Sequence, residues 1–309
     1  MGILDGKIAI VTGSGHGIGR GEALELAAQG AKVVVNDLGG SASGEGADKR
    51  PADEAVQVIT ARGGEAVANY DDVADFSGAE NLIAAAYDAF GGLDILVNNA
   101  GIIRDKMIVS MTEDDFDSVL RVHLKGTFAA TKFACIRWRE RTKAGEDVRA
   151  AVVNTVSSAG LQGNVGQANY GSAKAGIAAL TIITSLEGSR YGVRANAVAP
   201  GGVTRLTGGV LKDVELKEAD EYGDDEFNRL NPQNSAPMVA WLASDQALHV
   251  TGQVFRAVGG NIAHYEPWHL GGAVDNPKGE AKWDPAAIAA EVNAQIFHSR
   301  HPGLKMGGA

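Results

Sequence analysis

Short apolar runs, rich in β-branched residues, alternate with longer segments of helical pattern along most of the chain. The runs are apolar throughout, rather than alternately apolar and polar. Strands of this kind are typical of a parallel sheet that helices cover on both sides. The pattern therefore predicts an α/β fold, a single-domain, doubly wound parallel sheet. The expected strands lie at residues 8–11, 33–35, 67–68, 95–97, 151–153, 195–198 and 254–255, and the expected helices at residues 22–29, 79–90, 116–139 and 172–189.

This rhythm continues to about Gly260, so we expect one domain over residues 1–260. A glycine- and serine-rich loop at residues 39–51 follows the second strand. An acidic, irregular segment at about residues 204–234 is placed where a substrate loop is expected. Residues 261–309 form an extension with two tryptophans, which would be unusual in a disordered tail. We expect this extension to pack on the core or on a neighbouring subunit.

A glycine-rich turn at residues 12–19 follows the first expected strand and opens a helix. Glycines there let the backbone turn sharply and approach a pyrophosphate, which lies at the N-terminus of the helix. Such a turn alone is weak evidence, but the strand before it and the helix after it favour dinucleotide binding over a structural turn. The residues expected to bind the dinucleotide here are Gly13, Ser14, His16, Gly17, Ile18 and Gly19.

The end of the second strand bears on which dinucleotide binds. Asp37 stands about where a ribose-binding carboxylate is expected. A carboxylate accepts hydrogen bonds from a ribose diol and repels a 2′-phosphate, which favours NAD over NADP. His16 is a mild signal for NADP, because a basic residue there can meet the extra phosphate. A neutral histidine carries little charge at pH 7, so we expect NAD.

Composition limits the possible partners. A net charge of −10 disfavours nucleic acid, because binding to phosphates requires a basic surface. The single cysteine, Cys135, excludes an intramolecular disulfide and a cysteine-cluster metal site, and it fits a reducing cytoplasm. The N-terminus lacks the apolar run that would predict a signal peptide. No stretch approaches the ~20 apolar residues of a membrane span. We expect a cytoplasmic enzyme with a small-molecule substrate and no metal, membrane or nucleic-acid partner.

Candidate catalytic residues follow the fifth expected strand. Tyr170 and Lys174 are four residues apart and therefore share one face of a helix. Ser157 stands thirteen residues before Tyr170, just after the strand. A cation ~5 Å from a phenol, at an effective dielectric of ~20, favours the phenolate by about 3 kcal/mol, or roughly two pKa units. This predicts a Tyr170 pKa nearer neutrality, where the phenol can exchange protons.

Together these motifs resemble the short-chain dehydrogenase/reductase family from Leu4 to about Gly260. The resemblance implies a Rossmann fold in which Tyr170 is the general acid/base, Ser157 hydrogen-bonds the substrate oxygen, and Lys174 holds the nicotinamide ribose. It also implies a tetramer or dimer built through helices that start near residues 116 and 170. The further cofactor contacts that it implies are Asp72, Val73, Asn99, Ala100, Gly101, Tyr170, Lys174, Pro200, Gly201 and Val203.

Two positions depart from the usual pattern of the family. The family usually has an asparagine in the long middle helix, on a proton relay to the lysine, where this chain has His123. The histidine can hold the relay water or be a helix residue with no catalytic duty, and both readings stay open. Arg205 stands where a threonine is usual, which puts the contacts to the nicotinamide amide in question.

Several stretches, including residues 33–40 and 121–124, resemble one branch of the family: the 3-hydroxyacyl-CoA dehydrogenase part of the peroxisomal multifunctional enzyme type 2, also called 17β-hydroxysteroid dehydrogenase type 4. That branch shares the histidine at position 123. The resemblance implies NAD-dependent oxidation of a 3-hydroxyacyl-CoA, with a steroid alcohol or a steroid side-chain acyl-CoA as the main alternative. A distant alternative is an NAD-binding sensor without turnover, which the intact set of Ser157, Tyr170 and Lys174 disfavours.

Overall fold

The computed structural model describes residues 2–205, 217–222, 228–266 and, except for 271, 278 and 280, residues 269–296. The chain divides into two compact units, Met1–Tyr265 and Glu266–Ala309. In the described part of the second unit, helix α9 (Pro285–Gln295) begins after Asp284, whose carboxylate accepts a hydrogen bond from the Ala286 N–H at 3.0 Å. The residues of the candidate site all belong to the first unit.

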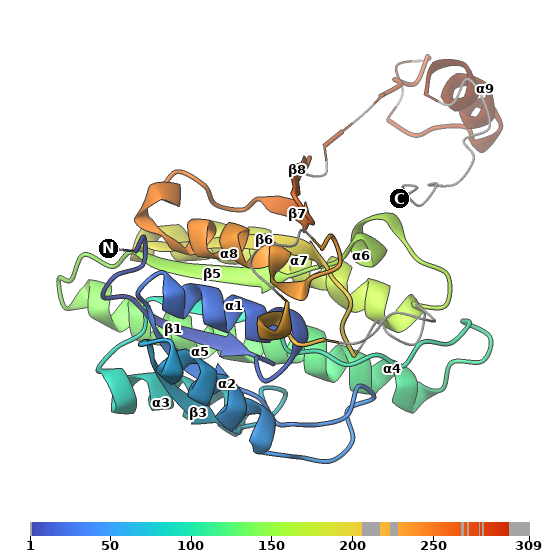
Figure 1. Ribbon diagram of the computed structural model, residues 1–309. Coiled ribbons are helices and arrows are strands. Elements are labelled where there is room, and N and C mark those ends of the chain that lie inside the picture. The colour runs from blue at the N-terminus through green and yellow to red at the C-terminus, as the bar shows by residue number, and fades with distance from the viewer. Residues whose placement is uncertain are drawn as a thin grey trace. The chain divides into compact units, whose positions relative to one another are not determined.

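One eight-stranded sheet forms the centre of the first unit, in the order β3-β2-β1-β4-β5-β6-β7-β8 (Figure 1). The strands pair in parallel, except that β8 runs antiparallel to β7. All the strands expected from the apolar runs are present, so the predicted doubly wound α/β fold is confirmed. The strands are β1 (Ile8–Thr12), β2 (Lys32–Asn36), β3 (Glu65–Asn69), β4 (Ile95–Asn98), β5 (Ala150–Thr155), β6 (Val193–Gly201), β7 (Val254–Val258) and β8 (Asn261–Tyr265).

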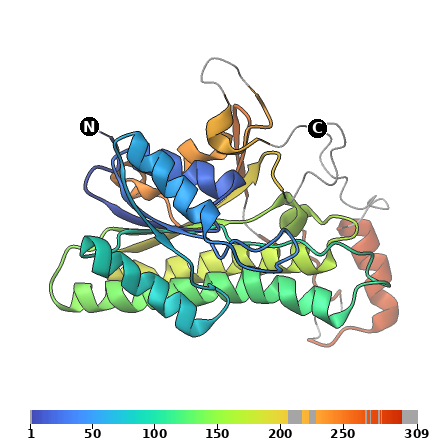
Figure 2. The same ribbon diagram turned by 60° about the horizontal axis from the view of Figure 1, so that its bottom comes forward.

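Helices cover both faces of the sheet, as the two sets of helices above and below it in Figure 2 show. Successive residues of a strand enter opposite layers: Val33 and Val35 pack in one buried cluster and Val34 in the other. This explains why the strands are apolar throughout rather than alternating. The first layer holds α1 (Gly17–Ala28), α2 (Arg50–Ala61) and α8 (Ala236–Ala243), and the second holds α3 (Phe76–Phe90), α5 (Gly126–Lys143) and α7 (Ala168–Gly188).

The long helix expected at residues 116–139 is interrupted. Helix α4 (Glu113–Leu120) passes into a π-helical turn, η1 (Arg121–Lys125), before α5 begins at Gly126. Such a turn inserts an extra residue into the helical repeat, and it is frequent at functional sites. Here it carries His123 into the interior, where the residue is 1% exposed.

The structure differs from the predicted domain boundary by five residues. Residues 261–265 form β8 and pair with the whole length of β7, from Val254–Tyr265 to Val258–Asn261. The compact unit therefore runs through Tyr265 rather than ending at about Gly260. Of the expected substrate loop, residues 206–216 and 223–227 lie outside the described residues. Among the described residues, no helix has the length and apolar character needed to cross a membrane.

Candidate active site

The residues singled out from the sequence gather at the carboxyl ends of the parallel strands. Strand order reverses between β1 and β4, because β2 lies on one side of β1 and β4 on the other. In open α/β sheets, ligands bind in the crevice that forms at this reversal. A pocket lies there, lined by the glycine-rich turn, the end of β2 and the segment after β4.

The glycine-rich turn leaves no room for side chains where it approaches the rest of the pocket. A Cβ on Gly13 would lie 2.7 Å from Ala100 Cα, and one on Gly19 would lie 2.3 Å from the Gly13 carbonyl oxygen. Gly13 also has φ +63°, in the left-handed region that favours glycine. The backbone is therefore bare where a pyrophosphate would approach it.

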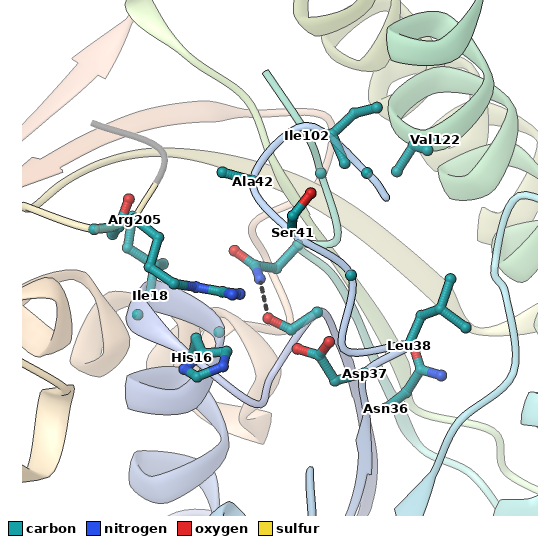
Figure 3. A pocket seen from close by; sticks show the side chains of 18 of the residues that line it. His16, Ile18, Asn36, Asp37, Leu38, Ser41, Ala42, Ile102, Val122 and Arg205 are labelled. Atoms are coloured by element: carbon teal, nitrogen blue, oxygen red, sulfur yellow. Dashed lines mark hydrogen bonds between the residues drawn. The ribbon is translucent and has the colours of Figure 1, made fainter. Parts of the chain in front are cut away.

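Asp37 fixes the far end of the pocket. Its Oδ2 accepts from the Gly15 N–H at 2.8 Å, and its Oδ1 accepts from the Gly39 N–H at 2.7 Å. Figure 3 shows His16 and Asp37 near one another, and the loop with Ser41 running between Asp37 and Ile102. The two N–H donors hold the carboxylate in place and leave each oxygen a further lone pair for a ribose hydroxyl.

A carboxylate from the expected substrate loop lies on the N-terminus of α1. Glu218 accepts from the Gly17 N–H at 2.7 Å and hydrogen-bonds His16 Nδ1 at 2.6 Å. Burial opposes ionisation, but the bonds from His16 and Gly17 lower the pKa of Glu218 below its usual value. An anion thus sits at the helix terminus where the partial positive charge of the helix favours a phosphate. The N-terminus of α1 therefore already binds an anionic group, as it would bind the pyrophosphate of a dinucleotide.

Ten of the residues expected to contact the dinucleotide line this pocket. Asp72 is one of them, and its Oδ2 accepts from Arg121 at 3.0 Å. The Asn99 amide donates to the Gly13 carbonyl at 3.0 Å and thereby ties β4 to the glycine-rich turn. The ten are Gly13, His16, Gly17, Ile18, Gly19, Asp37, Asp72, Val73, Asn99 and Gly101.

The other expected contacts lie outside the lining of this pocket. The Ser14 side chain is fully buried and donates to the Val11 carbonyl at 2.7 Å, which holds the turn to its strand. Val203 is 1% exposed, and its N–H donates to the Leu230 carbonyl. Ala100 donates its N–H to Thr12 Oγ1, and Pro200 and Gly201 pair with β7.

Tyr170, Ser157 and Lys174 lie together beside the carboxyl end of β5. Ser157 precedes the short helix α6 (Ser158–Gln162), its Oγ accepts from the Ala159 N–H at 3.2 Å, and its side chain lowers the pKa of Tyr170. Tyr170 is in the first turn of α7, and Lys174 follows one turn later. Lys174 Nζ lies 5.6 Å from the centre of the Tyr170 ring and donates to the Thr155 carbonyl at 2.6 Å.

The electrostatics of the pair differ from the simple expectation of a depressed phenol pKa. Burial raises the pKa of Tyr170, Ser157 lowers it, and the charge of Asp105 raises it further. Burial also lowers the pKa of Lys174 to about 7, and Glu22 opposes this change. Lys174 therefore loses its proton at a pH below that at which the phenol titrates, so its charge does not offset the burial of Tyr170.

His123 contacts both Tyr170 of α7 and Ile102, in the segment after β4. Its ring packs edge-on against Tyr170, with centroids 5.2 Å apart. Its Nε2 lies 3.1 Å from the Ile102 N–H nitrogen and 2.8 Å from the Ile102 carbonyl oxygen, while Nδ1 is buried without a partner. Burial, with the Lys174 charge, lowers the pKa of His123 to about 3. The imidazole is therefore neutral throughout the physiological range.

The structure adds three acidic residues that the sequence analysis did not single out. Asp105, after β4, accepts from Gln167 Nε2 at 2.8 Å and raises the pKa of the phenol. Glu218 covers the helix terminus, and the buried Glu22 is the carboxyl group whose charge raises the pKa of Lys174. No local motif marks any of them. The buried position of Glu22 within an apolar helix face, next to Ala23 and Leu26, was the one available signal.

Comparison with known proteins then decides the family. The profile of the short chain dehydrogenase family matches residues 7–214. The chain belongs to the short-chain dehydrogenase/reductase family. It is accordingly an oxidoreductase that acts on CH–OH donors, in a family that generally uses NAD(P).

Three relatives illustrate how far the similarity of this dehydrogenase extends. It is 40% identical to hydroxyacyl-CoA dehydrogenase ChsB1 of Mycobacterium tuberculosis, over 97% of this chain and 91% of that protein. It is 44% identical to peroxisomal multifunctional enzyme type 2 of Drosophila melanogaster, over 78% of this chain but only 37% of that enzyme. A crystal structure of a short chain dehydrogenase from Mycobacterium avium superposes with a TM-score of 0.82 at 45% identity, covering 95% of this chain and 97% of that one. The expected resemblance to the multifunctional-enzyme branch is thereby confirmed.

Proposed function

We propose that this dehydrogenase oxidises a 3-hydroxyacyl-CoA to its 3-ketoacyl-CoA with NAD. The observation that carries the reaction type is the grouping of Ser157, Tyr170 and, one helical turn later, Lys174 at the carboxyl end of β5, beside a pocket that fits a dinucleotide. The substrate class is supported by the relatives, one named a hydroxyacyl-CoA dehydrogenase and another a peroxisomal multifunctional enzyme. Asp37 supports NAD, since its held carboxylate suits a ribose diol.

The three polar side chains divide the work of the oxidation. Ser157 donates a hydrogen bond to the substrate oxygen and positions it near the phenol. Tyr170, as the phenolate, takes the hydroxyl proton as the alcohol becomes a ketone. A nicotinamide dinucleotide held in the pocket would supply the hydride acceptor for the carbon that bears the hydroxyl. Lys174 would hold the nicotinamide ribose, and its charge favours the phenolate when it is protonated. In the reverse direction, Tyr170 returns the proton to the nascent alcohol.

His123 belongs to the proposed site as a neutral hydrogen-bonding group. Its low pKa rules out a cationic role near pH 7. The unpartnered Nδ1 offers a hydrogen bond to a water, which is the duty of the asparagine usual at this position. The relay role predicts that His123→Asn retains turnover, and that His123→Leu loses it while still binding NAD.

The decisive test is a turnover panel. NAD and NADP are each offered with R- and S-3-hydroxyacyl-CoAs and with 17β-hydroxysteroids. The proposal expects the highest kcat/KM with NAD and a hydroxyacyl-CoA, and a higher value for a steroid alcohol would replace the substrate assignment. Tyr170→Phe should abolish turnover yet keep NAD binding. Tyr191→Phe, at the opposite end of the sheet before β6, is the matched control and should leave both unchanged.

Self-association is proposed through α5 and α7. Apolar side chains on their surface remain exposed in the single chain: Phe128 by 44%, Ile183 by 50% and Leu186 by 72%. Apolar area of this kind is buried in stable homo-oligomers. Light scattering on the size-fractionated protein should give a dimer or tetramer, and Leu186→Glu should shift it toward the monomer.

A further inference from the structure

Residues 39–48, in the glycine- and serine-rich loop, form a strap along one side of the dinucleotide pocket. The strap leaves the end of β2 just after Asp37 and returns to α2, which begins at Arg50. Figure 3 shows it passing between Asp37 and Ile102. Four of its residues line the pocket: Gly40, Ser41, Ala42 and Gly44. The strap is therefore a wall of the cofactor site, and the proposed reaction does not explain it.

The strap has a closed shape of its own. At its base, the Asp48 N–H donates to the Leu38 carbonyl at 3.1 Å. Within it, the Ser41 N–H donates to the Glu45 carbonyl at 2.8 Å, and the Glu45 N–H donates to Ser41 Oγ at 3.1 Å. A loop whose ends meet and whose interior is bonded in this way is a compact Ω-loop rather than a freely varying chain. Its position along the pocket then depends on what fastens its tip.

The tip of the strap is fastened to the segment after β4. The Ile103 N–H donates to the Ala42 carbonyl at 3.0 Å, and Arg104 Nε donates to the Ser43 carbonyl at 3.0 Å. The bond from Arg104 has a charged donor, and such bonds are roughly twice as strong as neutral ones. The guanidinium also pairs with Asp114 of α4. The Arg104 side chain is therefore the stronger of the two fasteners.

The backbone that carries this fastener is itself held in place. The Asn169 side chain is fully buried and donates to the Arg104 carbonyl and to the Asp115 carbonyl, each at 2.9 Å. These bonds join the segment after β4 to α7 and α4. A change of the Arg104 side chain should therefore loosen the strap and leave its anchor where it is.

The strap lies at the adenosine end of the pocket. Asp37 accepts from the Gly39 N–H at the base of the strap, and in dinucleotide-binding folds the carboxylate after the second strand binds the adenosine ribose. Asp72 and Val73, the expected adenine contacts, line the same pocket. The nicotinamide, in contrast, must reach Tyr170 for the proposed reaction. A ligand that holds only the adenosine half should therefore meet the strap.

We propose that Arg104 is a positioning residue of the cofactor site: it fastens the strap of residues 39–48 as a preformed wall against the adenosine half of the dinucleotide. The proposal rests on the proposed function in one respect, namely that the pocket binds a nicotinamide dinucleotide. A wall already in place spares the ligand the entropic cost of ordering the loop, and this raises affinity. Changes at one binding surface act mostly on dissociation, so a loosened strap speeds release of the ligand.

Arg104→Gln tests the proposal, because it removes the charged donor to the Ser43 carbonyl. Binding of NAD, of adenosine diphosphate and of nicotinamide mononucleotide is measured without acyl-CoA. NAD and adenosine diphosphate should each bind about tenfold more weakly, chiefly through faster dissociation, while nicotinamide mononucleotide should bind as it does to the native protein. Arg104→Lys should restore most of the affinity, since its ammonium can donate to the same carbonyl. Asp114→Asn, which breaks the ion pair but leaves the bond to Ser43, is the matched control and should change no affinity.

A second pair of variants displaces the strap without changing Arg104. Gly44 and Gly46 have φ +89° and +77°, in the left-handed region, so alanine strains the backbone at either position. A Cβ on Gly44 would lie 3.0 Å from Ile102 Cδ1 and push the strap away from it, whereas a Cβ on Gly46 meets no described atom within 4 Å. Gly44→Ala should therefore weaken the binding of adenosine diphosphate, and Gly46→Ala should weaken it much less.

These measurements separate failure of the strap from failure of the proposed function. Weaker binding of NAD and adenosine diphosphate to Arg104→Gln, in an enzyme that turns over no hydroxyacyl-CoA, would support the strap and refute the proposed substrate. Unchanged binding of adenosine diphosphate to both Arg104→Gln and Gly44→Ala would overturn the strap, whether or not the enzyme is active. An equal loss for nicotinamide mononucleotide would also overturn it, because the damage would then not be local to the adenosine end. A native protein that binds neither NAD nor NADP would refute both proposals.

Discussion

Asp37→Asn is the substitution that separates the two nicotinamide dinucleotides most directly. It removes one negative charge from a side chain that is 8% exposed and keeps an oxygen of similar position. In the native protein both carboxylate oxygens are held by backbone N–H groups of Gly15 and Gly39. The asparagine can satisfy one of these donors, while its own NH₂ faces the other. We therefore expect the variant to fold with a cost of about 1–3 kcal/mol.

The change in cofactor preference has two parts. For NAD, a charge-assisted hydrogen bond to the ribose is replaced by a neutral one, a loss of about 1 kcal/mol, or roughly fivefold. For NADP, a repulsion is removed. A 2′-phosphate with about 1.5 negative charges at ~5 Å and an effective dielectric of ~20 repels the carboxylate by about 5 kcal/mol, and solvent at the pocket mouth reduces this to roughly 2 kcal/mol. Together the ratio of kcat/KM for NAD over NADP should fall by about 100-fold.

The assay is initial-rate oxidation of one hydroxyacyl-CoA with each dinucleotide at fixed ionic strength. Urea unfolding monitors the folding cost separately. Asp53→Asn removes the same charge from α2 and should leave the ratio unchanged. A ratio in Asp37→Asn within about threefold of the native value would refute the reasoning, because the carboxylate would then not lie beside the 2′ position. Activity of the native enzyme with NADP alone would refute it as well.

Three further predictions follow from this arrangement. Glu218→Gln replaces the carboxylate on the N-terminus of α1 with a neutral amide, which competes less well with a phosphate for the Gly17 N–H. NAD binding, measured by fluorescence titration, should become about three- to tenfold tighter, and unchanged or weaker binding would show that the contact does not compete with the cofactor. The pKa of His123 is lowered to about 3, so the unfolded chain takes up a proton below pH 6.5 that the folded protein does not. The native protein should therefore lose stability as pH falls, and His123→Asn should reduce the loss between pH 6.5 and 5 by roughly 1.5 kcal/mol in urea unfolding; equal losses in both proteins would contradict the burial argument. Deletion after Tyr265, which keeps β8 paired with β7, should give a folded enzyme with an altered ratio of activities toward acyl-CoAs and steroids; an unaltered ratio would show that the extension does not select substrates.

The sheet could be predicted from the sequence because its signal is local and repeated. Each parallel strand is buried on both faces, so runs such as that at residues 33–35 are apolar at every position. Helix α2 was missed because it follows a glycine-rich loop and begins at Arg50-Pro51, where proline suggests an interruption. Proline is compatible with the first turn of a helix, where its missing N–H leaves no bond unmade. Strand β8 was assigned to the extension because the alternation of apolar runs and helical segments ends at about Gly260.

The arrangement of the site was predictable only where chain spacing fixes it. Tyr170 and Lys174 are one helical turn apart, so their proximity follows from the sequence. The position of Glu218 does not follow, because it reaches the site from a segment far away in the chain. Glu218 lies 201 residues from Gly17, and its carboxylate accepts a hydrogen bond from the Gly17 N–H. Such pairings depend on how the layers pack and have no local pattern.

The same distinction explains why the charge of Lys174 could be misjudged from spacing alone. A cation ~5 Å from a phenol lowers the phenol pKa only while it remains a cation. Burial works against that condition, since it lowers the pKa of Lys174 to about 7. The proximity of Lys174 to Tyr170 therefore does not by itself supply the positive charge that would lower the pKa of the phenol.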